Sequence, residues 1–296
     1  MFDLRYHVAS LAAVFIALIV GILIGVGLSG RGFVSDSERQ LLNARIDELQ
    51  KRAEAAESRA GALSDRQKGT ASFIERAYPT LVAGKLRTKR IAVVFVGSVD
   101  QGVRGDLLAT LGDAGAPGIA RLRALRIPID TQRLVTTIAR RPVLAPYQGV
   151  EALTDLGRDF GTQLLLGGTS PIVEALTPLL FEERTGNDRK PMDAVVVVRT
   201  AGPQRGATAL FLTGLYQGLG RAGIPAVGVE RTDTPSTAVG AFERAGLSTV
   251  DDIDDRTGRA ALVALLGGAA RGQYGVKATA VDGVIPEPVA AAAPRG

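Results

Sequence analysis

Residues 8–28 read VASLAAVFIALIVGILIGVGL, a run without a single charged side chain. At about 1.5 Å of rise per residue, a helix of roughly 20 residues crosses the ~30 Å hydrocarbon layer of a membrane. No later part of the sequence reaches this length without a charge, a proline or a glycine cluster. The run therefore predicts one membrane span, within an anchor over residues 1–34, with the rest of the chain on one side of the membrane.

A cleavable signal peptide is the alternative interpretation of this run. Its apolar core would be about 7–15 residues long and would end at a small-x-small site. The run is longer than that, and LSGRG at residues 28–32 is a poor cleavage site, so an uncleaved signal-anchor is favoured. Arg5 precedes the span and Arg31 and Arg39 follow it, so the positive-inside count barely discriminates. The short N-terminal flank favours a cytoplasmic N-terminus and a large domain outside.

Small side chains recur every four residues through the span and form one slowly winding ridge. Such ridges allow the backbones of two membrane helices to approach closely. This pattern favours self-association in the membrane; the alternative is that glycine and alanine are simply common in membrane helices. The ridge consists of Ala9, Ala13, Ala17, Gly21, Gly25 and Ser29.

A heptad pattern follows the span over residues 35–69, after a capping box formed by Ser35 and Glu38. Several of its core positions are alanine, which weakens a coiled coil. The alternative is a solvated helix lying against its own domain, but a membrane anchor raises the local concentration and favours a parallel dimer. One core position holds Leu42, Leu49, Ala56 and Leu63, and the other holds Ile46, Ala53 and Ala60.

Residues 70–87 are expected to connect this helix to a globular domain over residues 88–275. In the domain, valine-rich runs alternate with amphipathic helices, which predicts a doubly wound, mostly parallel α/β sheet covered on both faces. The prolines and alanines of residues 276–296 predict a disordered tail. Strands are expected at 91–96, 119–127, 192–198, 225–230 and 247–250, and helices at about 98–114, 131–139, 150–166, 171–183, 206–222, 237–245 and 256–270.

The composition narrows the range of functions. The net charge is +5, with the excess of basic side chains in residues 70–147. Membrane lipid is the expected contact for this charge, because the basic residues follow an anchor and lack the interleaved aromatics of a nucleic-acid surface. The chain has no cysteine, one histidine and two methionines. Disulfides and thiolate metal sites are therefore impossible.

Two glycine-rich stretches are candidate nucleotide-binding loops. Residues 218–223, GLGRAG, match a dinucleotide fingerprint, but that loop must follow a strand and open a helix. Here the string ends a predicted helix, so we interpret it as a helix stop. Residues 97–102 do follow a strand, yet Val103 and Arg104 replace the Lys-Ser/Thr pair of a phosphate loop.

The carboxyl ends of the predicted strands form the candidate ligand edge, because ligands of such sheets bind there. The acidic run Asp251, Asp252, Asp254 and Asp255 is favoured as helix capping over a cation site. No nucleophile–base pair is recognisable, and His7 lies at the membrane boundary, so we expect no enzyme activity and no cofactor. The edge consists of Gly97, Ser98, Arg199, Thr200, Glu230 and Asp251, with Arg231 beside them.

The opening residues MFDLRYHVASLAAVFIAL resemble the start of the actinobacterial MctB family. The glycine-rich second half of the span, the heptads and the α/β domain follow the order of that family. The resemblance implies a cell-envelope protein of copper transport that limits intracellular copper. It implies no catalytic or metal-ligand set that can be assigned to residues of this chain.

The chain has few donor atoms for the copper that the resemblance implies. Cu(I) prefers Cys or Met sulfur and Cu(II) suits imidazole, and the chain offers Met1, Met192 and His7, far apart in sequence. One helix encloses no pore, so a copper path would need an oligomer. Two hypotheses result: an envelope protein of copper transport or efflux, and a non-catalytic membrane-tethered dimer whose head binds a partner or a small ligand.

Overall fold

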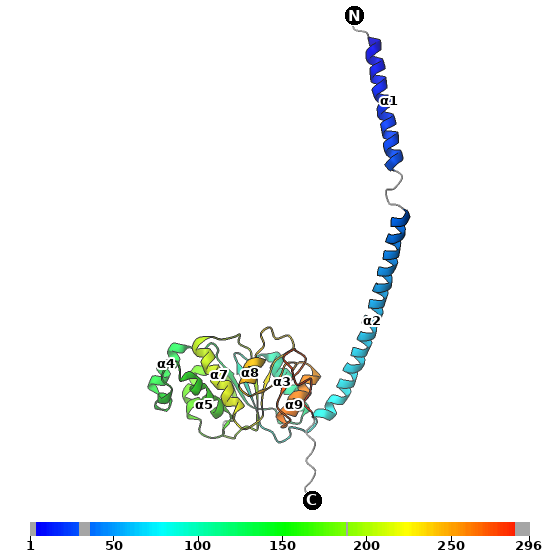
Figure 1. The fold of residues 1–296 in the computed structure, drawn as a ribbon. Coiled ribbons are helices and arrows are strands. Elements are labelled where there is room, and N and C mark those ends of the chain that lie inside the picture. Colours follow the sequence, from blue (N-terminus) through cyan, green and yellow to red (C-terminus); the bar gives the residue numbers. More distant parts are fainter. Residues whose placement is uncertain (1–3, 30–35, 188, 288–296) are drawn as a thin grey trace. The chain divides into compact units, whose positions relative to one another are not determined.

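The computed structural model describes residues 4–29, 36–187 and 189–287 (Figure 1). The chain divides into two compact units, residues 1–70 and residues 71–296. The first unit contains helix α1, Leu4–Ser29, and most of helix α2, Asp36–Val82. The second unit contains the end of α2 and a complete α/β domain, which we call the head.

Helix α1 has the length and composition required to cross a membrane. Its segment His7–Val26 has a mean hydropathy of 2.8 and is exposed in the isolated chain. Ridge positions Ala9 to Gly25 lie within this helix, and added Cβ atoms at Gly21 and Gly25 would meet nothing within 4 Å. Ser29 is the last helical residue, and its side chain lies outside the description, as does the whole of Ser35.

Helix α2 runs without a break through most of the expected connector and ends at Val82. Its heptad positions are exposed, with 54 % of Leu42, 50 % of Ile46 and 60 % of Leu49 accessible. Their pairing with a second helix remains a prediction. At the other end of α2, Tyr78 and Val82 are buried in the core of the head, which explains why the helix continues beyond the heptads.

The head is built on one seven-stranded sheet in the order β3-β2-β1-β4-β5-β6-β7. All neighbouring strands are parallel except β2 and β3, which are antiparallel. The predicted doubly wound, mostly parallel sheet is therefore confirmed. The strands are β1 Ile91–Val96, β2 Ile119–Leu125, β3 Phe181–Gly186, β4 Ala194–Arg199, β5 Ala226–Val229, β6 Ser248–Val250 and β7 Gln273–Tyr274.

The central strands are buried on both faces, as their continuous apolar sequences require. Alternate residues of a strand point to opposite faces. Thus Val94 and Val96 belong to one core, whereas Val93 and Phe95 belong to the other. The first core is covered by α4 Thr131–Arg140, the 3-10 helix η1 Pro142–Tyr147, α5 Leu153–Leu165, α6 Pro171–Leu180, α7 Gly206–Gly220 and α8 Val239–Arg244, and the second by α3 Gln101–Asp113, α9 Arg256–Leu266 and the end of α2.

Helices α5 and α7 pack side by side with their backbones in contact (Figure 1). Glycines face the contact from both helices: a Cβ at Gly214 would collide with the Thr154 carbonyl, and one at Gly157 with the Phe211 carbonyl. Gly218 meets the Arg158 carbonyl in the same way, and Gly223 ends the turn with φ of +75°. The glycine string at residues 218–223 thus packs and ends a helix, as its position after the helical run indicated.

Two predictions are wrong. The helix expected over residues 171–183 ends at Leu180, because Phe181–Gly186 leaves it to form an antiparallel edge strand on β2. The tail expected to be disordered from Val276 is folded up to residue 287. There, Asp282 accepts a hydrogen bond from the amide of Gln273 (2.8 Å), and the Gly275 amide donates to Gly283 (3.0 Å).

Candidate functional site

In the head, the strand ends that carry the predicted edge residues lie next to one another, and ligand binding there remains a prediction. Strands β1, β4, β5 and β6 are consecutive and parallel, so their carboxyl ends meet at one edge. The predicted residues directly follow or end these strands. They are Gly97 and Ser98 after β1, Arg199 and Thr200 at β4, Glu230 and Arg231 after β5, and Asp251 after β6.

The crevice between β1 and β4, where the strand order reverses, is filled by the protein itself. The amides of Thr200 and Ala201 both donate to the Val96 carbonyl (3.1 and 2.9 Å), and the Thr200 hydroxyl donates to the Ser98 carbonyl (2.7 Å). Gly97 has φ of +117°, and a Cβ there would lie 2.5 Å from Thr200 Oγ1. The usual ligand position of such sheets is therefore closed by the β4–α7 loop.

An open cleft of about 510 Å³ lies one strand further along the edge, beyond β4 and β5. One wall is the start of α3, with Asp100 and Gly102, and the other is the loop after β5. The cleft contains polar groups of both charges, but none of its described lining residues is a cysteine or a histidine. The lining includes Arg199, Thr200, Glu230, Arg231, Asp233 and Thr234.

Arg231 and Asp100, two charged residues of this cleft, have partners within the protein. Arg231 donates to Asp106 (2.9 Å) and to Asp233 (3.4 Å), and Arg259 donates to the other oxygen of Asp106 (2.6 Å). Asp100 caps α3 by accepting from the Val103 amide (2.9 Å). The arrangement suits the binding of a polar ligand by exchange of these contacts, and it presents no nucleophile beside a base.

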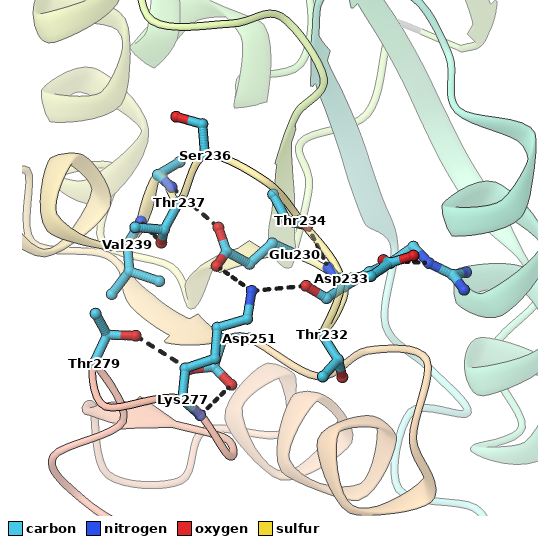
Figure 2. A network of polar contacts seen from close by, with 12 residues as sticks. Glu230, Thr232, Asp233, Thr234, Ser236, Thr237, Val239, Asp251, Lys277 and Thr279 are labelled. Carbon is cyan, nitrogen blue, oxygen red and sulfur yellow. Dashed lines mark hydrogen bonds and ion pairs between the residues drawn. The ribbon is translucent and has the colours of Figure 1, made fainter. Parts of the chain in front are cut away.

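Glu230 and Lys277 form a partly buried ion pair beside the carboxyl ends of the strands (Figure 2). Glu230 is only 5 % exposed, and its carboxylate accepts from Lys277 Nζ (2.8 Å) and from the Ala238 amide (3.0 Å). Lys277 Nζ also donates to the Arg231 carbonyl (2.8 Å). Glu230 thus holds the C-terminal segment and the start of α8 in place.

Asp251 binds the same C-terminal segment. Its carboxylate accepts from the amides of Val276 (2.9 Å) and Lys277 (3.3 Å) and from the Thr279 hydroxyl (3.2 Å). Figure 2 shows Asp251 and Lys277 approaching from separate segments. Gly275 is required beside them, because it has φ of +139° and a Cβ there would overlap the Asp251 carboxylate. This role was not predictable from the sequence, because the prolines and alanines further on are typical of a disordered tail.

The rest of the acidic run is structural, as its position before a helix indicated. Asp255 is the N-cap of α9, and Asp254 accepts from the Thr232 amide (2.8 Å). Asp252 is fully buried and accepts from the Thr257 hydroxyl (3.0 Å), while its Oδ1 has no hydrogen-bond partner. Burial, with the neighbouring carboxylates, raises the pKa of Asp252 to about 6. In the described residues, no three His, Cys, Asp or Glu side chains gather as a metal site.

The copper donors named from the sequence belong to different parts of the chain. Met192 is 5 % exposed and belongs to the core beneath α5 and α6. His7 lies on α1, in the other unit, and Met1 falls outside the described residues. The donor set in the described residues does not fit a protein-bound copper ion, because copper sites need several sulfur or imidazole ligands at one point.

These features define a class of protein: an α/β head that follows a long helix and an apolar N-terminal helix suited to membrane anchoring. The chain belongs to the family described as copper transport outer membrane protein, MctB, whose model matches residues 1–285. The match extends the resemblance of the first residues over the anchor, α2 and the head. No curated protein sequence matches the chain. The chain is thus a member of an envelope protein family of copper transport.

Proposed function

We propose that this protein is a non-enzymatic, membrane-anchored component of copper homeostasis in the cell envelope, and that it acts as a homo-oligomer. The observation that carries the proposal is the family match over residues 1–285, which includes the anchor and the head together. Because the match includes both parts, it supports a function of the whole anchored protein better than a function of the head alone.

Copper is the substrate in this proposal, and the head does not hold it as a cofactor. Met192 is buried, and Arg231 and Glu230 of the cleft are engaged in ion pairs with Asp106, Asp233 and Lys277. A single apolar helix satisfies its own backbone but encloses no pore. Any path for copper must therefore be formed between subunits or with a partner protein.

Oligomerisation is supported by two exposed features of the helices. Leu42, Ile46, Leu49 and Leu63 remain largely accessible in the isolated chain, and burying them against a second copy would remove apolar surface from water. The small-residue ridge of α1 offers a matching contact in the membrane. We propose a parallel dimer or a higher oligomer with the N-terminus in the cytoplasm and the head outside.

A deletion strain tests the copper function. Growth on a series of copper concentrations should stop at a lower concentration without the gene, and the full chain should restore it. Zinc at matched toxicity is the control, because a general envelope defect would change both responses. Equal copper tolerance of the deletion and parent strains would contradict the copper part of the proposal.

The second candidate function is a tethered dimer whose head binds a partner or a small ligand. The specific observation in its favour is the open cleft of about 510 Å³ beyond β4 and β5. The deletion strain separates the two ideas, because unchanged copper tolerance would leave only the second, and calorimetric titration of copper into the full chain in detergent tests direct binding of copper. We expect no stoichiometric site tighter than about micromolar, because the described donors are too few.

A further inference from the structure

The loops at the amino ends of the parallel strands carry an excess of basic side chains. Strands β2, β1, β4, β5, β6 and β7 are neighbours and parallel, so the loops that lead into them meet along one edge of the sheet, opposite to the ligand edge. These loops are residues 83–90, 114–118, 187–193, 221–225, 245–247 and 267–272. Their exposed basic residues, which we call the basic edge, are Lys85, Arg87, Arg189, Lys190, Arg221 and Arg271.

The protein does not neutralise the basic edge with its own carboxylates. None of the six residues forms an ion pair with a residue that the structure describes. In the described part of these loops, Asp193 is the one carboxylate, and Arg90 binds it at 3.0 Å; Asp188 lies outside the described residues. The opposite edge, by contrast, holds Asp100, Asp233 and the acidic run before α9. The head is therefore polarised, with its positive charge at the amino ends of the strands.

Helix dipoles do not account for this charge. Basic residues stabilise the negative end of a helix when they lie in its last turn. Helices α2, α3, α7 and α9 have no basic residue there. Lys85 and Arg271 lie in the loops beyond α2 and α9, Arg189 and Lys190 follow strand β3, and only Arg221 is at a helix cap. Most of the basic edge is thus free for a partner outside the chain.

The spread of the charge indicates an extended anionic partner. Six strands at a spacing of about 4.8 Å give an edge of roughly 24 Å, which is far longer than a small anion. The described residues of these loops include no aromatic side chain on which a nucleic-acid base could stack. A layer of anionic lipid headgroups needs neither a pocket nor stacking, and it attracts exposed Lys and Arg side chains.

We propose that the basic edge is a docking surface for anionic phospholipid headgroups of the membrane that holds α1. The apolar α1 supplies the second argument, because a tether to a membrane raises the local concentration of lipid around the head. The proposal rests on the membrane anchoring in the proposed function and is independent of copper.

Two single-cysteine variants of the full chain test the docking. The chain has no cysteine, so a fluorescent label reports on one position. Thr88→Cys lies in the loop before β1 and Ser98→Cys lies beyond its carboxyl end, and both positions are exposed. The labelled chains are reconstituted into phosphatidylcholine vesicles with or without phosphatidylglycerol. A small fraction of the lipid carries a nitroxide quencher on its headgroup.

The label at position 88 should be quenched at least about twofold more strongly than the label at position 98 in the anionic vesicles, because the basic edge holds it among the headgroups. The difference should disappear in neutral vesicles. It should also disappear in the anionic vesicles at about 1 M salt, which shortens the screening length to about 3 Å.

Charge variants connect the quenching to the basic edge. Arg189→Gln with Arg271→Gln removes two exposed charges from separate loops, and quenching at position 88 should fall about twofold in the anionic vesicles. Arg133→Gln with Arg205→Gln is the matched control. It removes the same net charge from exposed positions at the starts of α4 and α7, outside the basic edge, and should leave the quenching unchanged.

Equal quenching at the two labelled positions, quenching that is independent of lipid charge, or equal effects of the two double variants would overturn the proposal. Duplex DNA is the alternative partner. Its binding to the chain in neutral vesicles, lost in the basic-edge variant, together with quenching independent of lipid charge, would assign the edge to nucleic acid. Release of the chain from the vesicles by a carbonate wash would contradict the membrane anchoring as well, whereas a retained chain with equal quenching contradicts the docking alone.

Discussion

Asp252 is the residue whose chemistry most clearly follows from burial. Its carboxyl is fully buried, and one of its oxygens has no partner. Burial disfavours the charged form and raises the pKa to about 6 from an ordinary value of 3.8. A carboxyl whose pKa is raised by folding contributes stability below its unfolded pKa, and this contribution is lost as the pH rises through the folded pKa.

Asp252→Asn should therefore remove a pH dependence. The free energy of unfolding of the wild type should fall between about pH 4 and pH 7 relative to the variant, by roughly 2 kcal/mol. Urea denaturation of the full chain in detergent, followed by tyrosine circular dichroism at pH 4.5 and pH 7.5, measures this difference. Parallel pH profiles of the two proteins would show that Asp252 is charged without penalty in the folded state.

The residues of the sheet edge were predictable from the sequence, but their partners were not. Strand ends in a parallel sheet meet at one edge, so Arg199, Glu230 and Asp251 could be placed together from their positions after valine runs. Lys277 could not be placed, because a local pattern of prolines and alanines gives no sign of a contact with Glu230, which is distant in sequence.

Helices α5 and α7 leave no room for added volume at their contact. Gly157 and Gly161 face Gly214 and Gly218 in a contact where the backbones touch. The glycine spacing of α7 was visible in the sequence, where it resembled a nucleotide loop. The role of these glycines is to allow close contact with α5. The sequence of α7 alone does not show which helix it contacts.

Gly214→Ala should destabilise the head by about 1–3 kcal/mol, because its methyl group must displace the Thr154 carbonyl. Gly105→Ala in α3 is the matched control. An added Cβ there meets nothing within 4 Å, so the higher helix propensity of alanine should stabilise the head by roughly 0.5–1 kcal/mol. Urea denaturation of both variants measures the two effects. An equal change in the free energy of unfolding of both variants would show that helix propensity, not the α5–α7 contact, determines the effect of an alanine.

The edge strand β3 shows why the end of α6 was misplaced. The apolar periodicity of residues 171–180 leads directly into Phe181, which continues the pattern of a helix. Residues 181–186 nevertheless form a strand, because they pair with β2. Arg123 and Ala124 lie opposite Arg184 and Glu183 in this antiparallel ladder. Long-range pairing of this kind overrides local propensity.

At the scale of the whole molecule, the oligomer is the main prediction. Replacing both Ile46 and Leu49 by lysine places charges at exposed heptad core positions and should weaken self-association by more than tenfold, because a buried unpaired charge is costly. The control replaces Ala44 and Ser58, which lie away from the core positions, by lysine. Sedimentation of the full chain in density-matched detergent measures the mass of the assembly. Equal masses for both double variants would contradict a coiled-coil dimer.

The central claim is that the whole assembly limits copper inside the cell. Cell-associated copper, measured by mass spectrometry after growth in copper, tests it most directly. We compare a deletion strain complemented with the wild-type chain, with the Ile46→Lys, Leu49→Lys double variant, or with no chain. Cell-associated copper should be low with the wild type, and high with the double variant and without the chain. Equal copper in the wild-type and empty strains would contradict it.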